Sequence, residues 1–142
     1  MQIGRLTLAL CAAAALGAGA ADARVIYGNA GPNTLTGTGA PDTIFGLAGA
    51  DRVTGLGGAD TLWGGLGPDT LLGRRGRDVL NGGPGNDFLN GDAGGDTIRG
   101  GRGSDYVYAK DGVVDTIVCG LGQDQAYVNR GDKVSGCEIV VR

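Results

Sequence analysis

Eight aspartates follow one another at nine-residue intervals along the middle of the chain. They are Asp42, Asp51, Asp60, Asp69, Asp78, Asp87, Asp96 and Asp105, and Asn33 stands nine residues before the first of them. Carboxylates serve as general acids and bases, or as oxygen ligands for hard divalent cations. A constant interval means that these side chains belong to a repeating unit, so the geometry of that unit decides which chemistry applies.

A nine-residue repeat surrounds each of these acids. Nine consecutive nonapeptides run from Gly28 to Tyr108, such as GGLGPDTLL at 64–72 and GGPGNDFLN at 82–90. Position one is Gly in all nine, position four is Gly in eight, position six is Asp in eight, and position eight is Leu, Ile or Val in all nine. Repeats of fixed period predict a solenoid, in which each unit buries its apolar face only by stacking on its neighbours.

The columns of the repeat predict its local structure. Glycines at positions one and four allow positive φ and close backbone approach, so we expect a tight turn over the first six residues. Positions seven to nine are expected to form a three-residue strand, with position eight directed inward. The predicted buried ladder consists of Leu35, Ile44, Val53, Leu62, Leu71, Leu80, Leu89, Ile98 and Val107.

One aliphatic side chain in nine residues is a thin core, which implies another source of stability. If coils stack about 4.8 Å apart, as strands do, the aspartates form columns of like charge. A divalent cation between successive turns would turn this repulsion into attraction. Asp carboxylates and Gly carbonyls are hard oxygen ligands that suit Ca²⁺ better than Mg²⁺, and the chain has no His to bind softer metals.

With these columns, the nonapeptides match the pattern G-G-x-G-x-D-x-U-x, and residues 28–108 resemble the RTX, or haemolysin-type, calcium-binding repeats. The resemblance implies an all-β fold: a parallel β-roll, which is a right-handed β-solenoid with two nonapeptides per coil. Several Ca²⁺ ions, up to seven, would each lie between repeats n and n+2. One ligand column would be Asn33, Asp51, Asp69, Asp87 and Asp105, and the other Asp42, Asp60, Asp78 and Asp96. Carbonyls of turns such as those at Gly64, Gly65, Gly67, Gly82, Gly83 and Gly85 would complete the coordination.

Some repeats depart from the pattern. Position two is Gly in only three repeats, so turns with another residue there are expected to be strained if this position needs positive φ. Arg74, Arg75 and Arg77 surround Asp78, and their charge would weaken cation binding there. We therefore expect the best site between Asp69 and Asp87, and weaker sites at Asn33 and Asp78.

The N-terminal residues 1–23 have the features of a secretory signal peptide. Arg5 precedes an uncharged stretch from Leu6 to Leu16, and Ala21-Asp22-Ala23 fits the small-x-small rule for cleavage before Arg24. The alternative is an uncleaved apolar helix. Secretion would place the mature chain outside the cell, with no membrane span, and residues 24–108 would be its β-roll domain.

Residues 109–142 are expected to contain degenerate repeats and a C-terminal cap. The repeat slips by one residue at Ala109, and Asp115 and Asp124 then stand as further candidate ligands. Cys119 and Cys137 remain after removal of the signal peptide. An even number of cysteines in an oxidising compartment predicts one disulfide, which would close the cap.

The sequence predicts a structural rather than a catalytic protein, because no Ser-His-Asp, Cys-His or paired-carboxylate arrangement stands outside the repeat. We expect a secreted calcium-binding module that folds on binding Ca²⁺, with no nucleic-acid partner. The alternative is a Ca²⁺-dependent adhesion or ligand-binding protein that uses the flat strand face to bind a glycan, ice or another protein. Outward threonines favour this alternative, although other residues interrupt them. The threonines are Thr34, Thr43, Thr61, Thr70 and Thr97, and the interruptions are Arg52, Val79, Phe88 and Tyr106.

Overall fold

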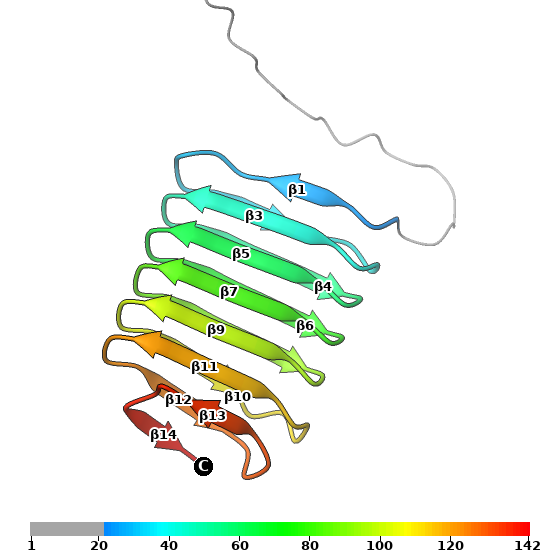
Figure 1. Ribbon diagram of the computed structural model, residues 1–142. Coiled ribbons are helices and arrows are strands. Elements are labelled where there is room, and N and C mark those ends of the chain that lie inside the picture. Colours follow the sequence, from blue (N-terminus) through cyan, green and yellow to red (C-terminus); the bar gives the residue numbers. More distant parts are fainter. Residues whose placement is uncertain (1–21) are drawn as a thin grey trace, which may run out of the picture.

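Each nonapeptide contributes one strand, and successive strands alternate between two parallel sheets (Figure 1). The computed structural model describes residues 22–142. The odd-numbered sheet contains β1 (Val25–Tyr27), β3 (Thr43–Ala48), β5 (Thr61–Leu66), β7 (Val79–Pro84), β9 (Thr97–Arg102), β11 (Thr116–Leu121) and β13 (Lys133–Ser135). The even-numbered sheet contains β2 (Thr34–Thr36), β4 (Arg52–Gly57), β6 (Thr70–Arg75), β8 (Phe88–Ala93), β10 (Tyr106–Ala109), β12 (Gln125–Val128) and β14 (Ile139–Val141). The predicted all-β parallel solenoid is confirmed, and residues 22–142 contain no helix.

The strand register shows that two nonapeptides make one coil. Ile44 pairs with Leu62 and Val53 with Leu71, so equivalent residues are 18 positions apart in the sequence. Where the repeat slips by one residue, the separation becomes 19, as in the pairing of Ile98 with Ile117. The sheet continues without a break, because the extra residue is absorbed before β11.

The prediction of three-residue strands is wrong for most of the solenoid. Only β1, β2, β13 and β14 have three residues, whereas β3 to β9 and β11 have six. The strands extend through positions one to three of the next nonapeptide, and Leu47–Ala48 therefore pairs with Gly65–Leu66. Position-one glycines such as Gly46 are not among the residues with positive φ, which allows the strand to pass through them.

The core is the predicted aliphatic ladder, one side chain wide. Eight of its nine members, from Ile44 to Val107, have no exposed surface, and Leu35 in the second strand is partly buried against them. The degenerate repeats continue the same cluster with Ile117, Ala126 and Val128. Both sheets therefore send one row of side chains into a shared interior, and little apolar surface is available to stabilise each coil.

From the third repeat onward, position two has a left-handed backbone whether or not the residue is glycine, whereas Asn29 and Thr38 in the first two repeats do not have positive φ. Leu47 has φ of 83°, Leu56 of 84° and Arg74 of 83°, and Gly65 has φ of 111°. A side chain is costly in this region, by roughly 1 to 3 kcal/mol. The expected strain at non-glycine turns is thus present in the backbone.

Replacing Leu47 by Gly is expected to raise the free energy of unfolding in saturating Ca²⁺ by about 1 kcal/mol, because the strain exceeds the entropy cost of a glycine. The matched control is Leu66→Gly, since Leu66 is also exposed but does not have positive φ. That control should lose about 1 kcal/mol. Chemical denaturation measures both, and equal losses would contradict the assignment of strain.

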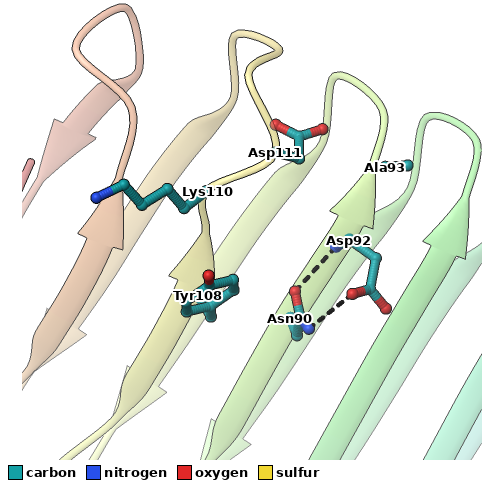
Figure 2. A pocket seen from close by; sticks show the side chains of 6 residues that line it. All are labelled: Asn90, Asp92, Ala93, Tyr108, Lys110 and Asp111. Atoms are coloured by element: carbon teal, nitrogen blue, oxygen red, sulfur yellow. Dashed lines mark hydrogen bonds between the residues drawn. The ribbon is translucent and has the colours of Figure 1, made fainter.

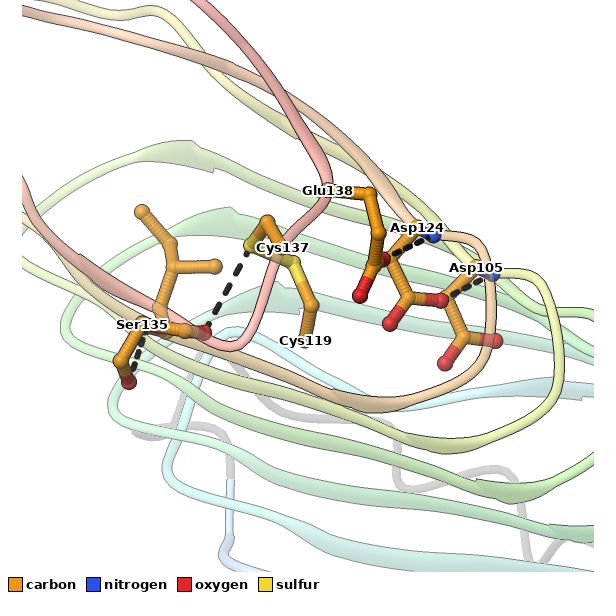
Figure 3. Close-up of a disulfide and its surroundings, with 7 residues drawn as sticks. Asp105, Cys119, Asp124, Ser135, Cys137 and Glu138 are labelled. Carbon is orange, nitrogen blue, oxygen red and sulfur yellow. Dashed lines mark hydrogen bonds between the residues drawn. A yellow bond between two sulfur atoms is a disulfide. The ribbon is translucent and has the colours of Figure 1, made fainter.

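The C-terminal coil is closed by the predicted disulfide. Cys119 in β11 is bonded to Cys137, with Cα atoms 5.1 Å apart, and the bond ties β11 to the segment that leads into β14 (Figure 3). In residues 22–142, no helix has the length and apolar character needed to cross a membrane. The predicted signal peptide lies outside the described residues, apart from Asp22 and Ala23.

Candidate metal centre

The position-six aspartates form two hydrogen-bonded columns along the solenoid. In the column of the odd-numbered sheet, the backbone N–H of Asp42 donates to Oδ1 of Asp60 at 2.7 Å, and that of Asp60 donates to Oδ1 of Asp78 at 2.8 Å. In the other column, the N–H of Asp69 donates to Oδ1 of Asp87 at 2.8 Å. The turn that contains each position-six aspartate therefore directs the carboxylate toward the turn 18 residues earlier.

The columns continue through the degenerate repeats. The backbone N–H groups of Asp96 and Asp105 donate to Oδ1 of Asp115 and Asp124, at 2.7 and 2.8 Å. Two members were not predicted from the sequence: Asp132 accepts from Asp115 N–H, and Glu138 accepts from Asp124 N–H (Figure 3). Their separations in the chain, 17 and 14 residues, differ from the regular 18, and the signal in the sequence was a valine or isoleucine within two residues after each acid.

The second oxygen of most column aspartates is buried without a hydrogen-bond donor. Asp69 and Asp87, for example, are 3% and 2% exposed, and their Oδ2 atoms have no partner. The column acids with such an unpaired oxygen are Asp51, Asp60, Asp69, Asp78, Asp87, Asp96, Asp105, Asp115 and Asp124. A buried polar oxygen without a partner is costly, so this repeated feature fits the binding of a cation beside Oδ2.

For six of these acids, the unpaired oxygen lies beside a carbonyl oxygen from the next coil: Asp51, Asp60, Asp69, Asp78, Asp87 and Asp105. A Cβ built on Gly73 would lie 2.5 Å from Oδ2 of Asp78 and 2.7 Å from the carbonyl oxygen of Gly91. Two acceptors thus converge on the space that a side chain at position one would fill. Glycine is required there for space rather than for its φ angle.

The six glycines predicted as carbonyl ligands lie in neighbouring turns of this arrangement. Beside Gly64, the carbonyl oxygen of Gly82 and Oδ2 of Asp69 converge. The other carbonyl oxygens point toward glycines of the next coil, that of Gly65 toward Gly83 and that of Gly67 toward Gly85. Ca²⁺ takes six to eight oxygen ligands at about 2.3 to 2.6 Å, from carboxylates and carbonyls alike. In residues 22–142 no three acidic, His or Cys side chains group together as a metal site, so carbonyls would have to supply part of any shell.

At the ends of the columns, donors from the protein itself fill the acceptors. Oδ2 of Asp42 accepts the backbone N–H and the hydroxyl of Thr38, and Oδ1 of Asn33 accepts the N–H of Asn29. At the other end, Oδ2 of Asp132 accepts the N–H of Asn129. The terminal members are therefore satisfied by the chain, and the unpaired oxygens belong to the interior coils.

Burial raises the pKa of the interior aspartates. Desolvation is the largest cause, and neighbouring column acids add to it, so that the pKa reaches about 6 at Asp60 and Asp105 and about 7 at Asp87 and Asp96. The N–H donated to each carboxylate opposes the shift without cancelling it. A chain without cations would thus hold protons in these columns near neutral pH.

This shift predicts that acid stabilises the metal-depleted chain. The carboxyl groups titrate near pH 4 when unfolded and at about 6 to 7 when folded. Their contribution to stability is complete below about pH 4 and is lost as the pH rises through 6 to 7. Circular dichroism of protein depleted of metal by dialysis should show more β structure at pH 5 than at pH 8. A spectrum that does not change over this range would contradict the prediction.

Asp92 differs from the column acids because its side chain lies on the outer face of β8. Its Oδ1 accepts Nδ2 of Asn90 at 2.8 Å, within a surface hollow that Tyr108, Lys110 and Asp111 also line (Figure 2). Arg74 lies 3.4 Å from Oδ2 of Asp92. One arginine of the cluster Arg74, Arg75 and Arg77 is thus paired with Asp92. The Oδ2 atom of Asp78 is buried and unpaired, like that of the other interior column acids.

The family model described as the RTX calcium-binding nonapeptide repeat (4 copies) matches the chain at residues 27–62, 63–98 and 81–113. These segments cover β2 to β10 and more than half of the chain. No curated protein and no solved structure matches the chain.

Proposed function

Because the chain belongs to the family of RTX calcium-binding nonapeptide repeats, we propose that it is a secreted structural module that folds on binding several Ca²⁺ ions. The observation that supports this most strongly is the row of unpaired Oδ2 atoms on nine buried column acids. A single unpaired oxygen is a local defect. Nine in register support the proposal of a common positive partner along the solenoid.

The chain's own residues prepare the sites. Position-one glycines leave space beside the Oδ2 atoms of the column acids from Asp51 to Asp105. Position-two and position-four turns direct carbonyls between coils, and the N–H donated to Oδ1 orients each carboxylate. Calcium would supply the positive charge that offsets carboxylate repulsion and desolvation. The proposed ligands are the position-six carboxylates Asp51, Asp60, Asp69, Asp78, Asp87, Asp96 and Asp105, together with Asp115 and Asp124 of the C-terminal coils. Asn33 and Asp42 are proposed only as the terminal residues of the two columns, because their side-chain oxygens already accept hydrogen bonds from Asn29 and Thr38.

An extracellular location suits this role. Extracellular calcium modules bind at roughly 10⁻⁴ to 10⁻³ M, so a chain with such sites would remain unfolded at cytosolic calcium levels and fold after export. The disulfide between Cys119 and Cys137 is the kind of bond that persists in an oxidising compartment. The predicted signal peptide at residues 1–23 provides the route.

A calcium titration of the exported chain tests the proposal. Circular dichroism should show a cooperative gain of β structure at neutral pH as Ca²⁺ is added, and calorimetry should detect several ions per chain. Mg²⁺ at the same concentrations is the control and should have a much smaller effect. A folded spectrum that is identical in chelator and in calcium would refute the proposal.

The strand register favours a second candidate function, ligand binding on the odd-numbered sheet. It aligns Thr43, Thr61, Val79, Thr97 and Thr116 in one outward row. Beside this row, the rings of Tyr27, Phe45 and Trp63 stack on one another, with centroids 5.1 and 6.3 Å apart. The threonines thus form a more regular row than their order in the sequence indicated. Such a face could contact a glycan or another protein once calcium has ordered it.

Trp63 reports directly on this candidate, because it is the only tryptophan in the chain and is 42% exposed. If the face binds a polysaccharide, its addition should change the tryptophan fluorescence in calcium, and Thr61→Lys should abolish the change while leaving the calcium response intact. An unchanged emission across a panel of neutral and acidic polysaccharides would remove support for glycan binding.

A further inference from the structure

Arg24 takes the place of an aspartate at the head of the column in the odd-numbered sheet. Its backbone nitrogen donates to Oδ1 of Asp42 at 2.6 Å, as the nitrogen of Asp42 donates to Asp60 at 2.7 Å. Its carbonyl accepts the N–H of Thr43 at 2.8 Å, as the carbonyl of Asp42 accepts that of Thr61 at 2.8 Å. The backbone of Arg24 therefore completes the last coil without contributing a carboxylate.

The bond that precedes this nitrogen is the predicted cleavage site. We propose that removal of residues 1–23 converts the Arg24 amide into an α-ammonium group that pairs with Asp42, so that the mature N-terminus is the cation that closes this end of the column. The inference rests on the proposed export with cleavage after Ala23. In that hydrolysis the bond between the Ala23 carbonyl carbon and the Arg24 nitrogen breaks. The oxygen of a water molecule joins Ala23 as a carboxylate, and the two protons of that water go to the Arg24 nitrogen, which leaves as an ammonium.

Asp42 needs a cation of this kind. It is 2% exposed, and both of its oxygens accept hydrogen bonds, Oδ1 from Arg24 and Oδ2 from Thr38. No Lys or Arg side chain in residues 22–142 forms an ion pair with it. A buried carboxylate with hydrogen bonds but no countercharge is costly, whereas a charge-assisted bond from an ammonium is roughly twice as strong as a neutral one.

Cleavage also removes an opposing charge. Asp22 lies two residues before Arg24 and is exposed in the uncleaved chain, so it adds a negative charge at the end of the column where Asp42 is already buried. After cleavage the same end has a positive group in place of a negative one. The interior acids have unpaired oxygens for calcium, whereas Asp42 has none. The solenoid would thus use calcium along its length and its own N-terminus at the end.

Two chains that differ by one residue test this inference. One is the exported, processed protein that begins at Arg24, and the other begins at Ala23, which displaces the ammonium by about 3.5 Å. In saturating Ca²⁺, the chain beginning at Arg24 should have a higher unfolding temperature, by about 4 °C. In the matched control, Asp42→Asn in both chains, the difference should fall below about 1 °C, because the carboxylate is gone.

The outcomes separate this inference from the proposed function. Equal unfolding temperatures in two chains that both respond to calcium would overturn the inference alone, as would a difference that persists with Asp42→Asn. A secreted protein whose sequenced N-terminus is another residue would also overturn it. Failure of both chains to fold with calcium would overturn the proposed function as well.

Discussion

A chain with Asp69→Asn and Asp87→Asn is expected to need roughly tenfold more Ca²⁺ to reach the midpoint of folding, because ligand charge sets the affinity of calcium sites. Asparagine keeps an Oδ1 that accepts the backbone N–H of the residue 18 positions earlier, so the hydrogen bond between turns is preserved. What is lost is the charge and the unpaired Oδ2 of each residue. Circular dichroism during a calcium titration measures the midpoint.

The matched control for this pair is Asp92→Asn. Asp92 lies in the repeat that follows that of Asp87, but its carboxylate is on the outer face, where it contacts Asn90 and Arg74. A partly exposed ion pair contributes little, so the calcium midpoint should change by less than about twofold. If Asp92→Asn has as large an effect as the double change, the assignment of position-six acids as the ligands is wrong.

The second large effect is expected from Gly73→Ala. The φ angle of Gly73 suits any residue, so only space opposes the change. The new Cβ would lie 2.5 Å from Oδ2 of Asp78 and 2.7 Å from the backbone oxygen of Gly91, which cannot move without shifting β8. We expect a loss of about 3 kcal/mol in the free energy of unfolding in saturating Ca²⁺, with fewer ions bound by calorimetry.

Gly57→Ala provides the comparison, since Gly57 also has an ordinary φ angle and lies in a strand of the same sheet. Its added Cβ would meet nothing closer than 3.7 Å. This variant should be unchanged or more stable, by up to about 1 kcal/mol, because alanine restricts the unfolded chain. Similar losses in the two variants would show that position one is not specially crowded.

The interior and the ends of the solenoid are stabilised differently. Interior coils repeat one environment, in which a carboxylate oxygen and a carbonyl oxygen face the same gap. At the ends, Thr38, Asn29 and Asn129 donate hydrogen bonds to the last acceptors of the columns. Calcium depletion should therefore remove the main stabilising interaction of the interior coils. The hydrogen bonds at the ends of the columns should persist, because they involve no metal. This pattern suits a repeat protein in which each coil depends on its neighbours.

The sequence by itself determined the repeating part of this protein. A nine-residue period with Gly, Asp and aliphatic columns predicted a solenoid and its aliphatic ladder, and the resemblance of these columns to the RTX repeats implied the parallel β-roll. The even number of cysteines predicted the disulfide between Cys119 and Cys137. The solenoid and its ladder follow from nearest-neighbour stacking, in which the same local contacts recur in every coil. A periodic sequence therefore specifies them without knowledge of the whole fold.

The tertiary structure alone decided features that depend on partners in other coils. The strands are six residues long because pairing between coils continues past position nine, and position one needs glycine because Asp and Gly oxygens from two coils occupy its space. The members that end the columns, Arg24, Asp132 and Glu138, break the 18-residue spacing or the residue type. Their roles arise where stacking stops, and a period carries no information about its own ends.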